Sequence, residues 1–121
     1  MTATRLNEVP EVSDEDFGAE VLLSPRPVLV EFTADWCPPC RQMAPVLSAL
    51  AEAEREWLKV VRLDVDSSPE TTLEYGVLSM PTLMVFRDGE PAGSVVGARS
   101  GRRLREELDR FLGRGAEGPR S

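Results

Sequence analysis

The chain has 121 residues, 41% of them hydrophobic and 29% charged, a composition typical of one soluble globular domain. Its 21 acidic and 14 basic residues give a formal charge of −7, which disfavours binding to nucleic acid. With no histidine and two cysteines, a single chain cannot form a histidine-dependent catalytic triad or a four-ligand zinc site. We therefore expect no metal; a zinc ion shared by two chains is the alternative.

The first half of the sequence predicts alternating strands and helices. A short, weak strand is predicted near residues 6–12, and the run from Ser13 begins like a helix, with a capping residue followed by acidic residues. The apolar run PVLVEFT, residues 27–33, predicts a buried strand. Residues 40–57 place apolar side chains at helical spacing and predict an amphipathic helix that Pro45 should kink.

The second half continues this alternation. The run LKVVRLDVD predicts another strand, and SPETTLEYG predicts a short helix that begins at Pro69. Residues 82–87 and 92–96 predict two strands joined at Asp88-Gly89, a strong signal for a hairpin. The run SGRRLREELDRFL predicts a final surface helix, whose interleaved charges indicate a solvated face and not a basic patch.

This order of elements predicts an α/β fold. A helix that links two parallel strands makes a right-handed crossover, and the hairpin adds antiparallel strands. We expect a central mixed sheet of four to five strands, flanked by helices on both faces. Residues 1–12 are expected to form an N-terminal extension, partly a short edge strand, residues 13–112 the domain, and residues 113–121 a flexible C-terminal tail.

The two cysteines, Cys37 and Cys40, lie where the strand predicted at residues 27–33 passes into the next helix. The free N–H groups in the first turn of a helix stabilise a thiolate. Cys37, near an exposed tip, is therefore predicted to attack disulfides, and Cys40, one turn further in, to resolve the mixed disulfide. A buried, inert thiol pair is the alternative; the prolines and the tryptophan beside Cys37 favour an edge of the fold over its core.

The segments VEFTADWCPPC, LDVD, YGVLSMPT and VVGA, in this order, resemble the thioredoxin family over residues 12–112. The resemblance implies the thioredoxin fold and a protein-disulfide reductase that acts by thiol–disulfide exchange on disulfide-containing protein substrates. It also implies recharging by a thioredoxin reductase that uses flavin and NADPH. We expect no cofactor in the chain itself, and a monomer.

The resemblance also assigns residues. Cys37 and Cys40 match the attacking and resolving thiols, and Pro81 matches a cis-proline that lies against them. A proline donates no hydrogen bond, which leaves the backbone of Met80 free to pair with an extended substrate. The implied apolar docking surface around the sulfurs consists of Trp36, Met80, Val96, Gly97 and Ala98.

Glu31 lies within the buried strand, where desolvation should raise its pKa. The family normally has an aspartate here, thought to take a proton from the resolving thiol through water, and Glu31 can do the same. Arg62 matches a lysine near this acid, and its charge would lower the pKa of Glu31; the sequence does not decide which effect is larger. A solvent-facing Glu31 is the alternative.

Most members of the family resemble W-C-G-P-C, whereas this chain has Pro38 and Pro39 between the cysteines. Pro38 removes one N–H group beside Cys37, and Pro39 disfavours a helical conformation at Pro38. The helix should then begin one residue late and leave Cys37 to the N–H groups of Cys40 and Arg41. We expect an altered redox potential of undecided sign.

Three functions fit the sequence: a general dithiol reductase, an oxidoreductase dedicated to one partner or to forming disulfides, and a non-catalytic binding module. The absence of an apolar run near 18 residues predicts no membrane span, and the N-terminal residues do not resemble a secretory signal. We expect a cytoplasmic protein; a signal that precedes this sequence is the alternative. A reducing compartment counts against the formation of disulfides as the function.

Overall fold

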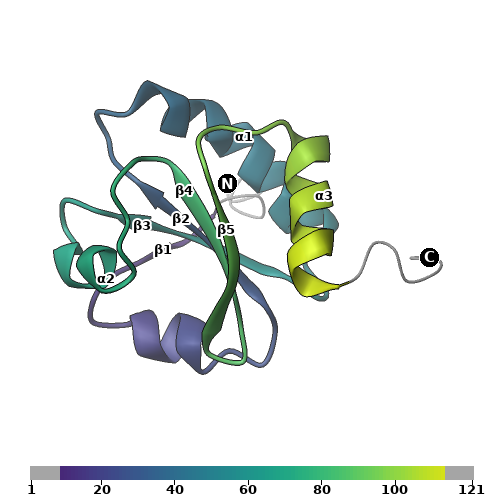
Figure 1. Ribbon diagram of the computed structural model, residues 1–121, viewed down its shortest axis with the longest axis horizontal. Helices are drawn as coiled ribbons and strands as arrows, with labels where there is room; N and C mark the ends of the chain where they lie inside the picture. The colour runs from purple at the N-terminus through teal and green to yellow at the C-terminus, as the bar shows by residue number, and fades with distance from the viewer. Residues whose placement is uncertain (1–8, 114–121) are drawn as a thin grey trace, which may run out of the picture.

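A computed structural model describes residues 9–113 of the chain (Figure 1). The predicted extension up to residue 8 and the predicted tail from residue 114 lie outside the described residues, and the division into domain and flanking segments stays a prediction. In chain order the elements are β1 (Glu11–Val12), the π-helix η2 (Gly18–Leu22), β2 (Val28–Thr33), α1 (Pro38–Ala53), β3 (Lys59–Asp64), α2 (Pro69–Glu74), β4 (Thr82–Arg87), β5 (Glu90–Val96) and α3 (Gly101–Leu112).

The strands form one five-stranded sheet in the order β1-β3-β2-β4-β5. β3 pairs in parallel with β1 and β2, whereas β4 pairs antiparallel with β2 and β5. The parallel pair β2–β3 is joined through α1, and β4–β5 is the predicted hairpin. Asp88 and Gly89 at its turn both have positive φ, 54° and 82°, as the tightest hairpin turns require. The predicted mixed α/β sheet is confirmed.

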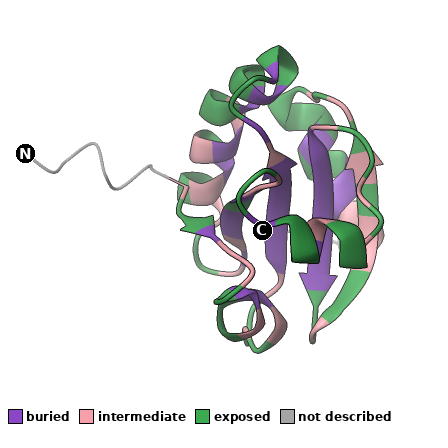
Figure 2. Cartoon of the chain, turned by 90° about the vertical axis from the view of Figure 1, so that its left-hand side faces the viewer, coloured by how far each residue is buried: buried purple, intermediate pink, exposed green. Residues whose placement is uncertain are grey.

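Helices cover both faces of this sheet. One apolar cluster joins α1 and α3 to one face, through residues such as Leu47 and Leu108. A second cluster joins the other face to η2 and to the end of α2, where Phe17, Tyr75 and Phe86 pack ring against ring. The central strands β2 and β4 are buried between these layers, whereas β5 at the edge of the sheet and the outward faces of the helices are partly or fully exposed (Figure 2).

The first predicted helix differs most from the structure. Residues 14–16 form a turn, and the helix there is limited to one residue before η2 and the five residues of η2 itself. Of the acidic residues expected in its first turn, Asp16 stays local and accepts the backbone N–H of Ser13 at 2.6 Å. The carboxylate of Asp14 instead accepts the backbone N–H groups of Glu70 and Thr71 at 3.1 and 2.8 Å. Asp14 therefore caps α2, a distant helix, instead of its own segment.

Gly93, on β5, is required by the packing of α3. A Cβ at Gly93 would lie 2.3 Å from Cγ of Phe111, closer than packed carbon atoms approach. Replacing Gly93 by alanine should therefore lower the free energy of unfolding by about 1–3 kcal/mol, as measured by urea denaturation. Gly101→Ala is the matched control, because nothing lies within 4 Å of a Cβ there. A Gly93→Ala protein as stable as the control would show that the ring of Phe111 moves aside freely.

Candidate functional site

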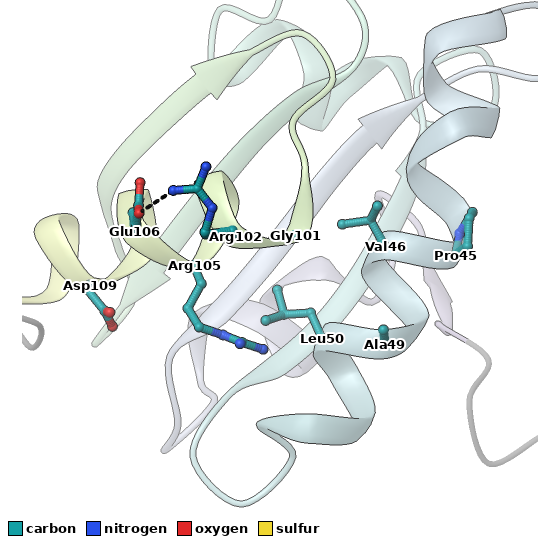
Figure 3. Close-up of a pocket in the computed structure, with 9 residues that line it drawn as sticks. All are labelled: Pro45, Val46, Ala49, Leu50, Gly101, Arg102, Arg105, Glu106 and Asp109. Atoms are coloured by element: carbon teal, nitrogen blue, oxygen red, sulfur yellow. Dashed lines mark hydrogen bonds and ion pairs between the residues drawn. The ribbon is translucent and has the colours of Figure 1, made fainter. Parts of the chain in front are cut away.

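A groove of about 690 Å³ lies between α1 and α3 (Figure 3). Pro45, Val46 and Leu50 on α1 form its apolar side, and charged residues of α3 form the other, among them the ion pair of Arg102 with Glu106 at 3.2 Å. The predicted site residues are not among those that line the groove. The chemistry predicted from the sequence lies instead at the N-terminal end of α1.

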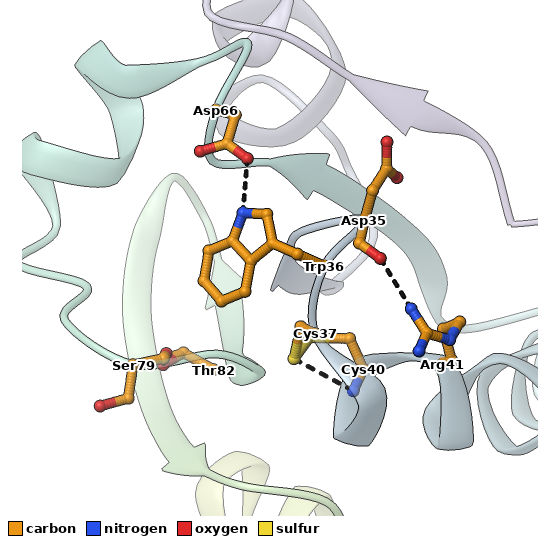
Figure 4. The surroundings of a disulfide bond; sticks show 8 residues. All are labelled: Asp35, Trp36, Cys37, Cys40, Arg41, Asp66, Ser79 and Thr82. Atoms are coloured by element: carbon orange, nitrogen blue, oxygen red, sulfur yellow. Dashed lines mark hydrogen bonds between the residues drawn. A yellow bond between two sulfur atoms is a disulfide. The ribbon is translucent and has the colours of Figure 1, made fainter.

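Cys37 is the N-cap residue of α1, four residues beyond the end of β2, and it forms a disulfide with Cys40 across a Cα–Cα distance of 5.3 Å (Figure 4). The backbone N–H of Cys40 donates to Sγ of Cys37 at 3.2 Å. Because Pro38 and Pro39 have no N–H group, Cys40 supplies the first N–H of the helix to this sulfur. The helix dipole and this donor both stabilise a negative charge on Cys37.

Two details of this predicted geometry are wrong. α1 begins at Pro38 and not later, because the first position of a helix tolerates proline. The N–H of Arg41 donates to the carbonyl oxygen of Cys37 at 3.2 Å and not to its sulfur. The N–H of Cys40 is shared between the same carbonyl oxygen, at 3.1 Å, and the sulfur.

The disulfide is also more buried than predicted. Cys37 and Cys40 are 3% and 4% exposed, and Ala34, Val65 and Met80 pack around them. The chain neighbours Trp36, Pro38 and Pro39 are exposed, so the pair lies just inside the surface. Exposure therefore does not decide which of the two cysteines is the more reactive. The position of Cys37 at the helix end does.

The structure brings the other predicted residues to the same place. The Met80–Pro81 peptide bond is cis, and the carbonyl oxygen of Pro81 accepts the N–H of Gly97 at 2.8 Å. This bond places the segment Val96–Gly97–Ala98, called the docking loop below, beside the cis-proline. Val96 is 56% exposed and Ala98 is also exposed.

Trp36 is the largest exposed ring beside the disulfide, at 61% exposed. Its Nε1–H donates to Oδ2 of Asp66 at 2.8 Å, which holds the indole in the orientation seen in Figure 4. Asp66 belongs to the LDVD segment, but its sequence position gave no sign of this contact. Leu78, 91% exposed and two residues before Met80, is a second residue of this region that the sequence did not single out.

Glu31 is buried, 3% exposed, at the centre of β2. Desolvation by burial raises the pKa of Glu31 from 4.5 to about 7, although the charge of Arg62, its register partner on β3, works in the opposite direction. The effect of burial on this pKa is therefore larger than that of Arg62, a comparison that the sequence did not decide. Oε2 of Glu31 has no hydrogen-bond partner. Glu31 and Cys40 line one cavity of about 320 Å³, room enough for water between them.

Pro38→Gly tests the effect of the additional proline, Pro38, which stands where most of the family has glycine. The change restores an N–H group beside the sulfur of Cys37 and loosens the backbone, two effects that act on the potential in opposite directions. One hydrogen bond is worth about 1 kcal/mol, so we expect a shift of about 20 mV in either direction, measured by equilibration with glutathione buffers. A potential unchanged within about 5 mV would assign Pro38 a purely structural role.

Residues 9–113 contain no group of three or more histidine, cysteine, aspartate or glutamate residues placed to hold a metal ion. In the same part of the chain, no helix is both long and apolar enough to cross a membrane.

Comparison with known proteins agrees with this geometry. The thioredoxin family profile matches residues 8–110. A thioredoxin of Mycobacterium tuberculosis is 44% identical over 108 residues, 89% of this chain and 93% of that protein. A thioredoxin of Synechocystis is 42% identical over 107 residues, 88% of this chain and all of that protein. A bifunctional thioredoxin reductase/thioredoxin of Mycobacterium leprae is 46% identical over 98 residues, 81% of this chain and 21% of that protein. The chain therefore belongs to the thioredoxin family and is a dithiol–disulfide oxidoreductase of the thioredoxin type.

Proposed function

We propose that the chain reduces disulfide bonds of protein substrates, with Cys37 as the attacking and Cys40 as the resolving thiol. The observation that carries this assignment is the position of Cys37 at the N-cap of α1, where its sulfur accepts the N–H of Cys40. A thiolate at that position is stabilised by the helix end and is the stronger nucleophile of the pair.

The reaction has two exchange steps. The thiolate of Cys37 attacks one sulfur of the substrate disulfide, forms a mixed disulfide and releases the other substrate sulfur as a thiolate. Cys40 then loses its proton and attacks the sulfur of Cys37. The Cys37–Cys40 disulfide forms, the second substrate thiolate leaves, and two electrons have passed to the substrate.

Glu31 is proposed to take the proton of Cys40 in the second step. Its pKa near 7 suits a group that gains and loses a proton at neutral pH. Both residues line the same cavity, and Oε2 of Glu31 is free of other partners, so a water molecule there could link the two groups.

The substrate is proposed to lie as an extended segment across Trp36, the Met80–Pro81 bond and the docking loop. Met80 packs against Cys37 and Cys40, and Trp36 and Val96 are exposed apolar side chains. Such a surface holds many different partners weakly, which suits a general reductase.

A thioredoxin reductase that uses flavin and NADPH is proposed to restore the dithiol, in the cytoplasm. The Mycobacterium leprae relative, which by name combines thioredoxin reductase and thioredoxin, supports this pairing.

Reduction of insulin by dithiothreitol tests the proposed activity. The chain should accelerate the precipitation of reduced insulin in proportion to its concentration, and a chain without effect would contradict the proposal. The same assay with thioredoxin reductase and NADPH in place of dithiothreitol tests the proposed partner separately: steady oxidation of NADPH supports it, and none while dithiothreitol still works would point to another reductant.

A further inference from the structure

The docking loop, Val96–Gly97–Ala98, joins β5 to α3 and is held on one side by the cis-proline. Gly97 has φ +100°, a backbone conformation that glycine adopts far more readily than other residues. Its N–H donates to the carbonyl oxygen of Pro81 at 2.8 Å. This bond fixes the middle of the loop but leaves the carbonyl groups of Val96 and Ala98 to be oriented by something else.

Arg99 supplies that second set of contacts. Its Nη1 donates to the carbonyl oxygens of both Val96 and Ala98, each at 3.1 Å. The same nitrogen lies 3.5 Å from the position that a Cβ of Gly97 would take, so the guanidinium packs against the backbone of the loop. A guanidinium presents several N–H groups in one rigid plane and can hold two acceptors at a fixed spacing.

The backbone of Arg99 connects the loop to the helix that carries the dithiol. Its N–H donates to Sδ of Met43 at 3.3 Å. Met43 is buried in α1, one turn after Cys40. The docking loop is thus hydrogen-bonded to Pro81 through Gly97, and the backbone of Arg99 is bonded to α1 through Met43. The side chain of Arg99 bonds the carbonyl groups on either side of Gly97.

We propose that Arg99 is a positioning residue that holds the docking loop in the shape that receives an extended segment of a protein substrate. This inference rests on the proposed function and adds the residue that sets the shape of its substrate surface. Arg99 acts through the loop and not on the sulfurs. Its effect therefore falls on substrates with a polypeptide chain to lie along the loop, and not on small disulfides.

The test compares two substrates with the reduced full-length chain. The second-order rate constant for oxidation is measured with insulin and with hydroxyethyl disulfide, which has no peptide chain. Arg99→Met keeps the aliphatic stem and removes the donors. Arg102→Met is the matched control, because it also removes one positive charge, from an exposed side chain of α3 paired with Glu106.

Arg99→Met should lower the rate constant for insulin about fivefold and leave the rate constant for hydroxyethyl disulfide within about twofold of the wild type. Arg102→Met should leave both unchanged. Arg99→Lys keeps a charged donor but not the planar guanidinium, so its insulin rate should lie between those of Arg99→Met and the wild type. It serves as the test if Arg99→Met does not fold: an insulin rate equal to that of the wild type would then overturn the inference.

An Arg99→Met protein with the same ratio of the two rate constants as Arg102→Met would overturn the inference, as would an equal fall for both substrates. Failure of the proposed function would give a different result, because the wild-type chain itself would then not reduce insulin.

Discussion

Cys37→Ser should lose the protein-disulfide reductase activity by a factor of about 10³ or more, because serine is no nucleophile toward disulfides at neutral pH. The chain contains no third cysteine to replace it. Cys40→Ser should lose turnover to a similar degree for a different reason: Cys37 still attacks, but nothing resolves the mixed disulfide. Initial rates of insulin reduction measure both losses.

Mass spectrometry separates the two roles. Cys40→Ser incubated with a protein disulfide should accumulate a covalent adduct through Cys37, one substrate per chain, that dithiothreitol releases. Cys37→Ser should form much less of it. This contrast matters because both cysteines are almost equally buried, so their positions relative to the helix end distinguish them. If Cys37→Ser is the variant that accumulates the adduct, the assigned order of the two thiols is wrong.

Glu31→Gln should make the protein more stable than the wild type above pH 7, by about 2 kcal/mol, and this difference should disappear toward pH 4.5. The pKa of Glu31 is raised from 4.5 to about 7 in the folded chain, chiefly by burial. Such a shift corresponds to about 3 kcal/mol, and water in the neighbouring cavity should reduce the effect.

The direction in which stability changes with pH follows from proton binding by Glu31. Between pH 4.5 and 7 the folded state holds the proton of Glu31 while the unfolded state has lost it, so the free energy of unfolding falls as pH rises. Below this range the carboxyl is neutral in both states and burial costs little; above it, the folded chain must bury a charge. Glutamine has no such charge. Urea denaturation at a series of pH values measures the difference.

Glu31→Asp is the conservative control, because it keeps a titrating carboxyl in β2 and should retain the fall in stability with pH. A Glu31→Gln protein whose stability runs parallel to that of the wild type from pH 4.5 to 8 would show that burial does not perturb Glu31.

Most of the fold could be predicted because each element carries its own local signal. The run at residues 27–33 is apolar throughout because β2 is covered on both faces, and Asp88-Gly89 supplies the two positive φ angles of the hairpin. The helix predicted from Ser13 was wrong in its extent because it, too, was predicted from a local pattern alone. Asp16 does make a local contact with the N–H of Ser13, but Asp14 caps α2, more than fifty residues away, and no local pattern reveals that contact.

Some residues of the site could also be predicted from a local motif, and others could not. The spacing of Cys37 and Cys40 and the cis-proline at Pro81 were readable because a short motif carries them. The contact of Asp66 with Trp36 and the closure of the docking loop by Arg99 depend on side chains that meet only in the folded chain. The direction of the pKa shift of Glu31 could not be predicted either, because burial and the charge of Arg62 have opposite effects on this pKa. Only the structure gives the degree of burial.

The proposed reaction requires that Cys37, in the reduced chain, is held as a thiolate by the end of α1. Its rate of alkylation by iodoacetamide, followed against pH in the Cys40→Ser background, measures this directly. We predict a rate that is half-maximal below about pH 7.5. A rate that rises only above about pH 8.5, as for an ordinary exposed thiol, would contradict the claim.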